Sequence, residues 1–513
     1  MTTTYGPDAP QPAVQRADVA KGAGMAALAR FGGLIELVSQ PLFTWLYGLA
    51  GYGLYAVLWA LVNVSLNVVN LSMELAMQRL LPASASAQER CAVVRTAMMI
   101  VISLSVIAAL AICWQADAIA AVLSVSPEQR AHLPFAISLF AWTLPLAVIV
   151  ETATGAVRAM RAFGPEIRLR IMWEQIARLL FAVSFFAIGF NHTGLLMGHL
   201  ASLSVTAALS LRLLGNQFGW GLLVAAPRPH GLIGRVIRTG LALMPTTLGR
   251  RALNDLPTVA LNLMVPGAAG AIAAGLFVIA RKIASVPLAV RQPFLYVLAP
   301  LAAEQAAQDR RHIAPLYSFA THISLMLAGY LTIATLLLSR DILALFSGGA
   351  QAALPMVVAL LCARLFEAVF GPASPIVEMT GHPVLPLVNS AAGVTTWAAL
   401  AFWLVPTMGA AGMAVAVAAG VVIVTGGALV EMMFLYRLTP FSAGFGRCLA
   451  VLAVAGGVLW AASWLLSPLG HYGHAAGLIA VGIPLFWAAL RLGLGHEDKA
   501  ALGPIASRLR IQG

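Results

Sequence analysis

The chain has 513 residues, of which 60% are hydrophobic and only 10% are charged, whereas soluble domains carry about 25% charged residues. This composition excludes a soluble globular protein. The formal net charge of +12 does not indicate nucleic-acid binding, because the basic residues are spread over alternate connections between apolar segments.

Apolar segments recur along the whole chain, and at roughly 20 residues or more each is long enough to cross a hydrocarbon core of about 30 Å. The pattern predicts an all-α, polytopic membrane protein with about fourteen transmembrane helices. The predicted helices cover residues 24–49, 54–81, 91–114, 133–157, 169–190, 194–214, 240–264, 271–302, 313–338, 353–379, 384–405, 410–436, 445–466 and 474–494.

The distribution of arginine predicts how these helices are oriented. Every second connection is basic, whereas the connections on the other side offer only Arg130 and Arg340. Because positively charged connections stay in the cytoplasm, we expect a multi-pass protein of a bacterial inner membrane with both termini cytoplasmic. The polar segment 1–22 does not resemble a signal peptide and is predicted to be a flexible cytosolic tail, and residues 495–513 are predicted to form a second one.

The chain contains an internal repeat. The segment Gly53-Leu-Tyr-Ala-Val57 in helix 2 returns as Gly275-Leu-Phe-Val-Ile279 in helix 8, about 220 residues later. Two repeats of six helices that begin on the same side of the membrane must run parallel. We therefore expect an N-lobe at 23–214 (helices 1–6), a cytoplasmic linker at 215–231, a C-lobe at 232–436 (helices 7–12) and two accessory helices within 437–494.

The accessory helices are predicted to face lipid. They contain no Asp, Glu, Lys or Arg between Arg447 and Arg491. Nothing in their sequence therefore marks them as part of a polar cavity.

Helices 7 and 8 carry the most unusual charges. Predicted helix 7 (240–264) holds Arg250, Arg251 and Asp255 within an apolar segment. Predicted helix 8 (271–302) holds three further cations, Arg281, Lys282 and Arg291. A charge facing lipid near the bilayer centre costs roughly 2.5–3.5 kcal/mol, so these side chains predict a hydrated basic cavity. Asp255 follows Arg251 by one helical turn and is expected to neutralise it.

Eight basic residues in predicted helices are candidates for binding an anionic substrate, namely Arg30, Arg178, Arg250, Arg251, Arg281, Lys282, Arg291 and Arg364. Some have a structural alternative. Arg178 and Arg364 can pair with acids in their own helices, Glu174 and Glu367 respectively. Arg30 is close enough to the end of its predicted helix for its side chain to reach the membrane–water interface.

Acidic residues within the helices can balance these cations or bind a coupling ion, either H⁺ or Na⁺. Glu36, Glu151 and Asp255 are the candidates for ion coupling, and Glu74 and Glu378 are further balancing charges. Glu36 ranks first because no basic residue lies three or four positions away from it.

Four segments carry a family resemblance, namely Gly51-Tyr-Gly-Leu-Tyr-Ala56, Gln78-Arg-Leu-Leu-Pro82, Arg158-Ala-Met-Arg-Ala-Phe-Gly164 and Ala274-Gly-Leu-Phe-Val-Ile-Ala-Arg281. With them the chain resembles the multidrug/oligosaccharidyl-lipid/polysaccharide (MOP) exporter superfamily, and within it the Wzx-type polysaccharide flippases. The resemblance implies alternating access that moves an undecaprenyl-diphosphate-linked oligosaccharide across the membrane for exopolysaccharide or O-antigen (lipopolysaccharide) assembly. Its implied partners are membrane lipid and a polysaccharide polymerase or co-polymerase.

Three other functions are alternatives to this one. An enzyme is disfavoured because the outer loops are short and no phosphate-binding loop or paired acidic motif occurs, so no catalytic residue, cofactor or metal site is predicted. A drug/cation antiporter of the same fold (MATE-like) would need an acidic pocket, whereas helices 7 and 8 are net basic. A MurJ-type lipid II flippase shares the cationic cavity and stays an alternative, although the arginine-rich N-terminal helix of that branch is missing here.

Overall fold

The computed structural model describes residues 16–160, 167–227, 229–290, 313–379, 384–435 and 437–502. Within these ranges the secondary structure is helical, with no strand. Eight helical segments are long and apolar enough to cross a membrane, and several of them are long enough for two crossings. The chain is thus a multi-pass membrane protein with an all-α fold.

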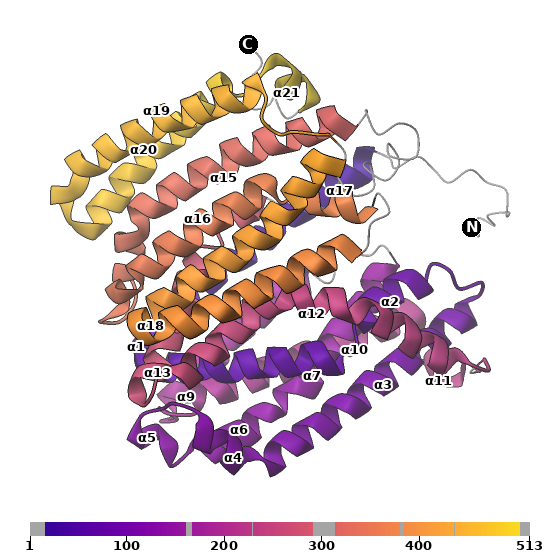
Figure 1. Cartoon of the computed structure of the whole chain (residues 1–513). Helices are drawn as coiled ribbons and strands as arrows, with labels where there is room; N and C mark the ends of the chain where they lie inside the picture. Colours follow the sequence, from indigo (N-terminus) through magenta and orange to yellow (C-terminus); the bar gives the residue numbers. More distant parts are fainter. Residues whose placement is uncertain are drawn as a thin grey trace.

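The first half of the chain, residues 16–227, contains the helices from α1 to α11 (Figure 1). Its elements are α1 (Arg16–Val69), α2 (Met73–Leu80), α3 (Ala87–Trp114), α4 (Ala116–Val122), α5 (Pro127–Arg130), α6 (Leu133–Ala141), α7 (Thr143–Ala159), the π-helix η1 (Ile167–Trp173), α9 (Glu174–Ala187), α10 (Gly194–Phe218) and α11 (Trp220–Ala225).

The second half, residues 229–502, contains helices α12 to α21. They are α12 (Leu232–Met264), α13 (Ala268–Ile283), α15 (Ile313–Ala344), the 3-10 helix η3 (Ala350–Ala353), α16 (Leu354–Phe370), α17 (Ala373–Met379), α18 (Val384–Leu435), α19 (Ala443–Leu466), the 3-10 helix η4 (Ser467–Leu469), α20 (Gly470–Gly493) and α21 (His496–Ala501).

Glycine and proline explain several of the breaks and kinks in the observed helices. Gly48 (φ 71°) and Gly409 (φ 56°) kink α1 and α18 where the sequence predicts one span to end and the next to begin. Glycine can adopt this left-handed backbone conformation without a side-chain clash. Conversely, the predicted helix 133–157 is divided at Trp142 into α6 and α7. Pro145 has no N–H to donate to the carbonyl of Ala141, which favours a break there.

The two halves lie side by side, and α1 packs along α12 and α13 of the second half (Figure 1). The closest approach involves two glycines. A Cβ atom on Gly53 would lie 1.8 Å from the carbonyl oxygen of Ala271, and one on Gly275 would lie 3.1 Å from the Cα of Gly53. Only glycine allows the two backbones to come this close. These are also the two glycines that begin the repeated sequence segments.

Ionic contacts collect at one end of the bundle, which we call the basic end. Glu89 at the start of α3 pairs with Arg235 near the start of α12, with 2.6 Å between Oε1 and Nη2. Close by, Arg95 donates to the carbonyl oxygens of Val224 and Ala226, which follow α10. The basic end thus joins the two halves and the segment between them.

Helices α19 and α20 pack together at the edge of the bundle, against α15 (Figure 1). At the basic end His322 Nδ1 lies 3.1 Å from an oxygen of Asp498 in α21. At the opposite end the two carboxylate oxygens of Asp341 lie 2.8 and 2.5 Å from Nδ1 of His471 and His474. Polar contacts at both ends therefore hold α20 and the following α21 to α15.

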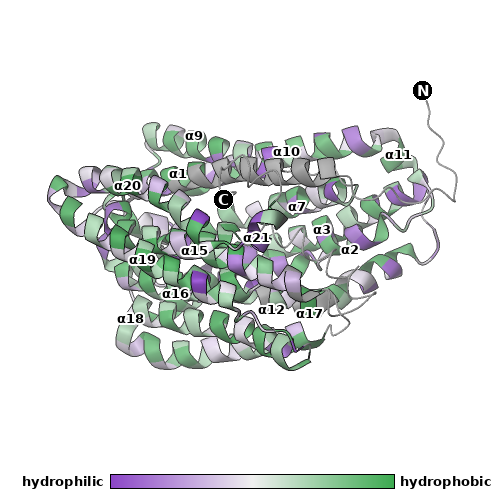
Figure 2. Ribbon diagram, turned by 90° about the horizontal axis from the view of Figure 1, so that it is seen from above, coloured by the Kyte–Doolittle hydropathy of each residue, from purple (hydrophilic) through white to green (hydrophobic). Residues whose placement is uncertain are grey.

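The outer surface of this pair is apolar. Figure 2 shows hydrophobic residues along most of α18, α19 and α20. Trp460, Trp464 and Tyr472 are exposed to 67%, 71% and 80%. Large exposed apolar side chains suit contact with hydrocarbon, as the absence of charge in this part of the sequence predicts.

Candidate functional site

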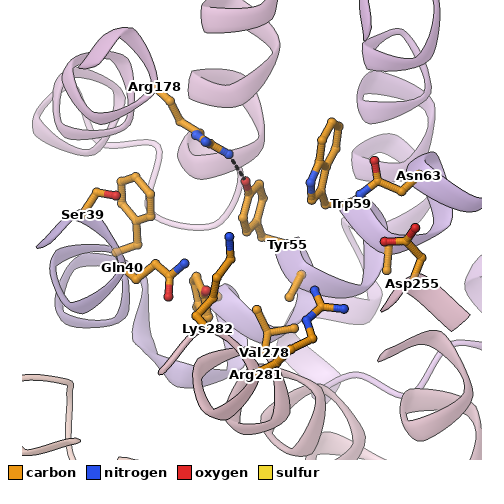
Figure 3. A pocket seen from close by; sticks show the side chains of 14 residues that line it. Ser39, Gln40, Tyr55, Trp59, Asn63, Arg178, Asp255, Val278, Arg281 and Lys282 are labelled. Atoms are coloured by element: carbon orange, nitrogen blue, oxygen red, sulfur yellow. Dashed lines mark hydrogen bonds between the residues drawn. The ribbon is translucent and has the colours of Figure 1, made fainter. Parts of the chain in front are cut away.

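A cavity of about 230 Å³ lies between the two halves of the chain (Figure 3). The first half contributes residues of α1 and α9, and the second half contributes residues of α12 and α13. The lining residues are Ser39, Gln40, Phe43, Tyr52, Tyr55, Ala56, Trp59, Ala60, Asn63, Arg178, Asp255, Val278, Arg281 and Lys282.

Among the described residues, three basic side chains and one carboxylate line this cavity, so this part of its lining is net basic. Arg281 and Lys282 lie in the last turn of α13, directly after an apolar stretch that is buried. Cations are favoured at a helix C-terminus, where backbone carbonyls lack partners and the helix dipole is negative. Arg281 is also close enough to act electrostatically on Asp255 of α12.

The third cation, Arg178 of α9, is held by the first half. Its Nη1 donates to Tyr55 Oη at 3.0 Å, and its other terminal nitrogen donates to Gln175. Tyr55 Oη in turn lies 2.8 Å from Nδ1 of His199, which is fully buried. Sequence reasoning did not single out His199, because a histidine within an apolar segment has no local pattern that indicates a role.

The cavity also offers hydrogen-bonding and aromatic groups. The amide oxygen Oε1 of Gln40 is buried and has no hydrogen-bond partner among the described residues. The aromatic rings of Trp59 (Figure 3) and Tyr52 also line the cavity. The cavity can therefore receive a ligand that carries negative charge together with hydroxyl donors and stacking surfaces.

A polar network joins the halves beside the cavity, toward the basic end. Arg251 Nη1 donates to Asn67 Oδ1 at 2.6 Å, and Asn67 Nδ2 donates to Asp255 Oδ2 at 3.3 Å. Arg251 also lies 3.8 Å from both Glu74 and Glu151. The expected neutralisation of Arg251 by Asp255 alone is therefore incomplete, because its acidic partners come from the other half of the chain.

The two glutamates of this network have further partners in the first half. Glu74 pairs with Arg158, and Glu151 lies 3.5 Å from Arg170 and accepts a hydrogen bond from Asn70 at 3.0 Å. Removal of Arg251 would therefore leave both carboxylates with other partners.

Cross-half contacts also close the seam on the opposite side of the cavity. The Gly53–Ala271 approach lies there, and Asn262 of α12 bonds both the backbone N–H and the carbonyl of Ser124, at 3.1 and 2.7 Å. The cavity thus lies between a polar network at the basic end and tightly packed backbones at the other end. Such a site can open to either side only if one set of contacts separates.

The structure brings together some of the predicted site residues and separates others. Arg178, Asp255, Arg281 and Lys282 line the cavity, and Arg251 and Glu151 belong to the adjacent network. Arg364 instead pairs with Glu367 at 2.6 Å and bonds Asn254 at 3.3 Å, and it is not one of the lining residues.

Four other predicted residues keep their roles as predictions. Arg30, Glu36 and Arg250 belong to described helices, but their side chains lie outside the described set, and Arg291 lies outside the described residues altogether.

No protein-family model matches the chain, and no curated protein matches it in sequence. Its fold, however, is similar to the folds of several solved transporters. The lipid II flippase MurJ in an inward closed conformation has a TM-score of 0.70 and 11% identity, over 91% of this chain and 97% of that one. An inward-facing MATE family multidrug resistance transporter has a TM-score of 0.63 and 14% identity, over 79% and 94%.

A third structure is a MOP superfamily transporter from Pyrococcus furiosus, described as having a binding pocket of reverse polarity. It has a TM-score of 0.59 and 13% identity, over 82% of this chain and 95% of that one. At such identities the likeness extends to the fold and not to the residues of the site.

Proposed function

We propose that the protein is a flippase that carries an undecaprenyl-diphosphate-linked oligosaccharide across a bacterial inner membrane by alternating access. The observation that supports this most is the cavity, in whose described lining Arg178, Arg281 and Lys282 outnumber the carboxylate of Asp255. A guanidinium can donate two parallel hydrogen bonds to a phosphate and stays charged, so arginine suits a diphosphate. The aromatic rings suit the sugars, as does the acceptor of Gln40, which has no partner among the described residues.

The proposed alternating access requires that the two lobes rock against each other. One observation supports this motion, because the equivalent glycines of the sequence repeat, Gly53 and Gly275, face each other where the halves meet. Equivalent residues of a repeat meet in this way near the axis that relates the two copies. The remaining partners we propose are membrane lipid, H⁺ or Na⁺ as coupling ion, and a polysaccharide polymerase or co-polymerase.

Transport of lipid II is the second candidate, and the fold shared with MurJ favours it. Both substrates present a diphosphate to the cavity, so the same cations would serve either. Complementation separates the two. A lipid II flippase should restore growth to cells that lack their own, whereas a polysaccharide flippase should restore only surface polysaccharide.

The cavity cations give the main test of the proposed function. A charge-assisted hydrogen bond contributes about 1.5–3 kcal/mol, so Arg178→Ala or Arg281→Ala should weaken binding of the diphosphate roughly 10- to 150-fold. Cells with either variant should lack surface polysaccharide and accumulate lipid-linked repeat units in the inner leaflet. Lysine at either position should rescue export only partly, because it keeps the charge and loses the forked geometry.

The matched control is Arg340→Ala, since Arg340 is exposed at the end opposite to the basic end. It should export normally. Normal export by both cavity variants at native abundance would contradict an anionic substrate and favour an antiporter of drugs or cations.

The orientation can be tested with single cysteines at exposed positions near the two ends of the bundle. In a background without the four native cysteines, Asn191→Cys and Ala269→Cys should react with an impermeant maleimide in intact cells. Asn216→Cys should react only after the membrane is permeabilised, because the basic end is predicted to face the cytoplasm. Labelling of Asn216→Cys in intact cells would reverse the proposed topology.

A further inference from the structure

A buried histidine is connected to a cation of the cavity through one tyrosine. Arg178 and Tyr55 line the cavity, and Figure 3 shows the Arg178 guanidinium directed at the Tyr55 hydroxyl. His199 of α10 lies on the far side of that hydroxyl, with Nδ1 at 2.8 Å from it. A continuous chain of hydrogen-bonding groups thus runs from the cavity wall to a fully buried imidazole.

The surroundings of His199 are aromatic. The ring centroids of Trp59, Tyr55 and Phe140 lie 4.3, 5.5 and 5.5 Å from that of the imidazole. Its second nitrogen, Nε2, is buried and has no hydrogen-bond partner among the described residues. A buried polar atom without a partner is destabilising, so packing alone does not explain a histidine here. An ionisable side chain inside a membrane bundle is by default a candidate for a functional role.

Besides burial, the charge of Arg178 acts on the imidazole of His199. Helices α1 and α6 contribute aromatic rings at this point, and α9 contributes Arg178 itself. The other charged side chains on the described parts of α7, η1 and α9 are Glu151, Arg158, Arg168, Arg170 and Glu174.

The shared tyrosine oxygen makes the two groups sensitive to each other's charge. Arg178 is always positive and donates to Tyr55 Oη. A protonated imidazole would place a second positive charge on the other side of the same oxygen, which the guanidinium repels. An anion bound to Arg178 would compensate its charge and so remove that repulsion. Anion binding in the cavity therefore favours protonation of the ring.

We propose that His199 is a proton-binding site whose occupancy is coupled, through Tyr55 and Arg178, to an anion in the cavity. The inference rests on the proposed function, because it requires an anionic substrate. Thermodynamic linkage makes the coupling reciprocal, so that a proton on His199 also tightens the binding of the anion. The proton offsets part of the negative charge that the substrate brings into the cavity between the two halves of the chain, where uncompensated charge is costly.

Proton uptake during binding tests this coupling. The probe is farnesyl diphosphate, titrated into the purified protein in detergent by calorimetry in two buffers of different ionisation enthalpy. The wild type should take up more protons per bound probe than His199→Gln, with a difference of up to about one proton. Its affinity should also fall more steeply with rising pH, by up to about tenfold more per pH unit. Comparing the two proteins removes the protons that the probe itself exchanges.

Two further variants separate coupling from a purely structural role. Tyr55→Phe keeps the imidazole and removes the bridging oxygen, so its proton uptake should fall toward that of His199→Gln. His322→Gln is the matched control, because His322 is also a largely buried histidine but bonds Asp498 away from the cavity. It should take up as many protons as the wild type.

The outcomes distinguish this inference from the proposed function. If His199→Gln or Tyr55→Phe binds the probe and takes up as many protons as the wild type, the proton site is wrong and the anionic cavity stands. If the wild-type protein does not bind farnesyl diphosphate, both are wrong. If the loss of proton uptake is confined to the two variants, the coupling is confirmed.

Discussion

Gly53→Ala is expected to open the seam between α1 and α13 and abolish export, although it adds a single methyl group. The new Cβ would lie 1.8 Å from the carbonyl oxygen of Ala271 and 2.6 Å from its carbonyl carbon. These are backbone atoms, so no side-chain rotation can relieve the clash, and the helices themselves must move apart. Overpacking of this kind costs about 1–3 kcal/mol or more. This cost corresponds to a shift of at least roughly 5- to 150-fold in the equilibrium, away from the arrangement in which α1 and α13 are in contact.

The separation can be measured between spin labels on the two halves at this end, at the exposed positions Val122 and Ala269. With Gly53→Ala the distance distribution should lengthen or broaden. The control is Gly51→Ala, whose Cβ would meet only the Cβ of Tyr47 at 3.4 Å, an ordinary contact. Alanine is favoured over glycine within a helix by about 1 kcal/mol, so this variant should be as stable as the wild type or more stable. Equal behaviour of the two variants would contradict the close packing at Gly53.

Arg251→Glu is expected to separate the halves at the other side of the cavity, toward the basic end. The substitution removes the hydrogen bond to Asn67 and places a third carboxylate beside Glu74 and Glu151, which lie 3.8 Å from the native guanidinium. It thus replaces attraction to these two carboxylates with repulsion. Loss of one charge-assisted hydrogen bond alone shifts the equilibrium between joined and separated halves roughly 10- to 150-fold, and the repulsion adds to this shift.

Arg235→Glu provides the matched control for this charge reversal. Arg235 also lies on α12 and pairs across the seam, with Glu89, but half of its side chain is exposed. Exposed ion pairs contribute about 0–1 kcal/mol, so this reversal should have a small effect. Cysteine cross-linking across the basic end, with export measured in parallel, should show a large loss for Arg251→Glu alone. Equal losses for both reversals would indicate general charge sensitivity and not a specific contact at Arg251.

The membrane imposes much of the fold, and for that reason the sequence predicts it well. Backbone groups in hydrocarbon must be satisfied within each segment, so long apolar stretches have to be helices. The helical breaks near Gly48 and Gly409 also follow from local sequence. The break at Trp142 was missed because helical periodicity continues on both sides of it.

The candidate site could be predicted only in part. A cation within an apolar helix is a conspicuous local signal, and Arg178, Arg281 and Lys282 do line the cavity. Arg364 has the same signal and yet pairs with Glu367 in its own helix. Local sequence indicates that a charge within an apolar helix needs a partner. It does not indicate whether the side chain pairs with a neighbour in its own helix or lines a cavity.

The sequence by itself determined that this chain is a helical membrane protein with cations among its helices, because both properties depend on residues that are close together in the chain. Only the tertiary structure decided which groups meet. Helical spacing places three- and four-residue neighbours on one face and cannot specify contacts between helices. The contacts of Arg251 with Glu74, of Asn67 with Asp255 and of Tyr55 with His199 join residues far apart in sequence. They follow from how the helices pack, which is the level at which the cavity is formed.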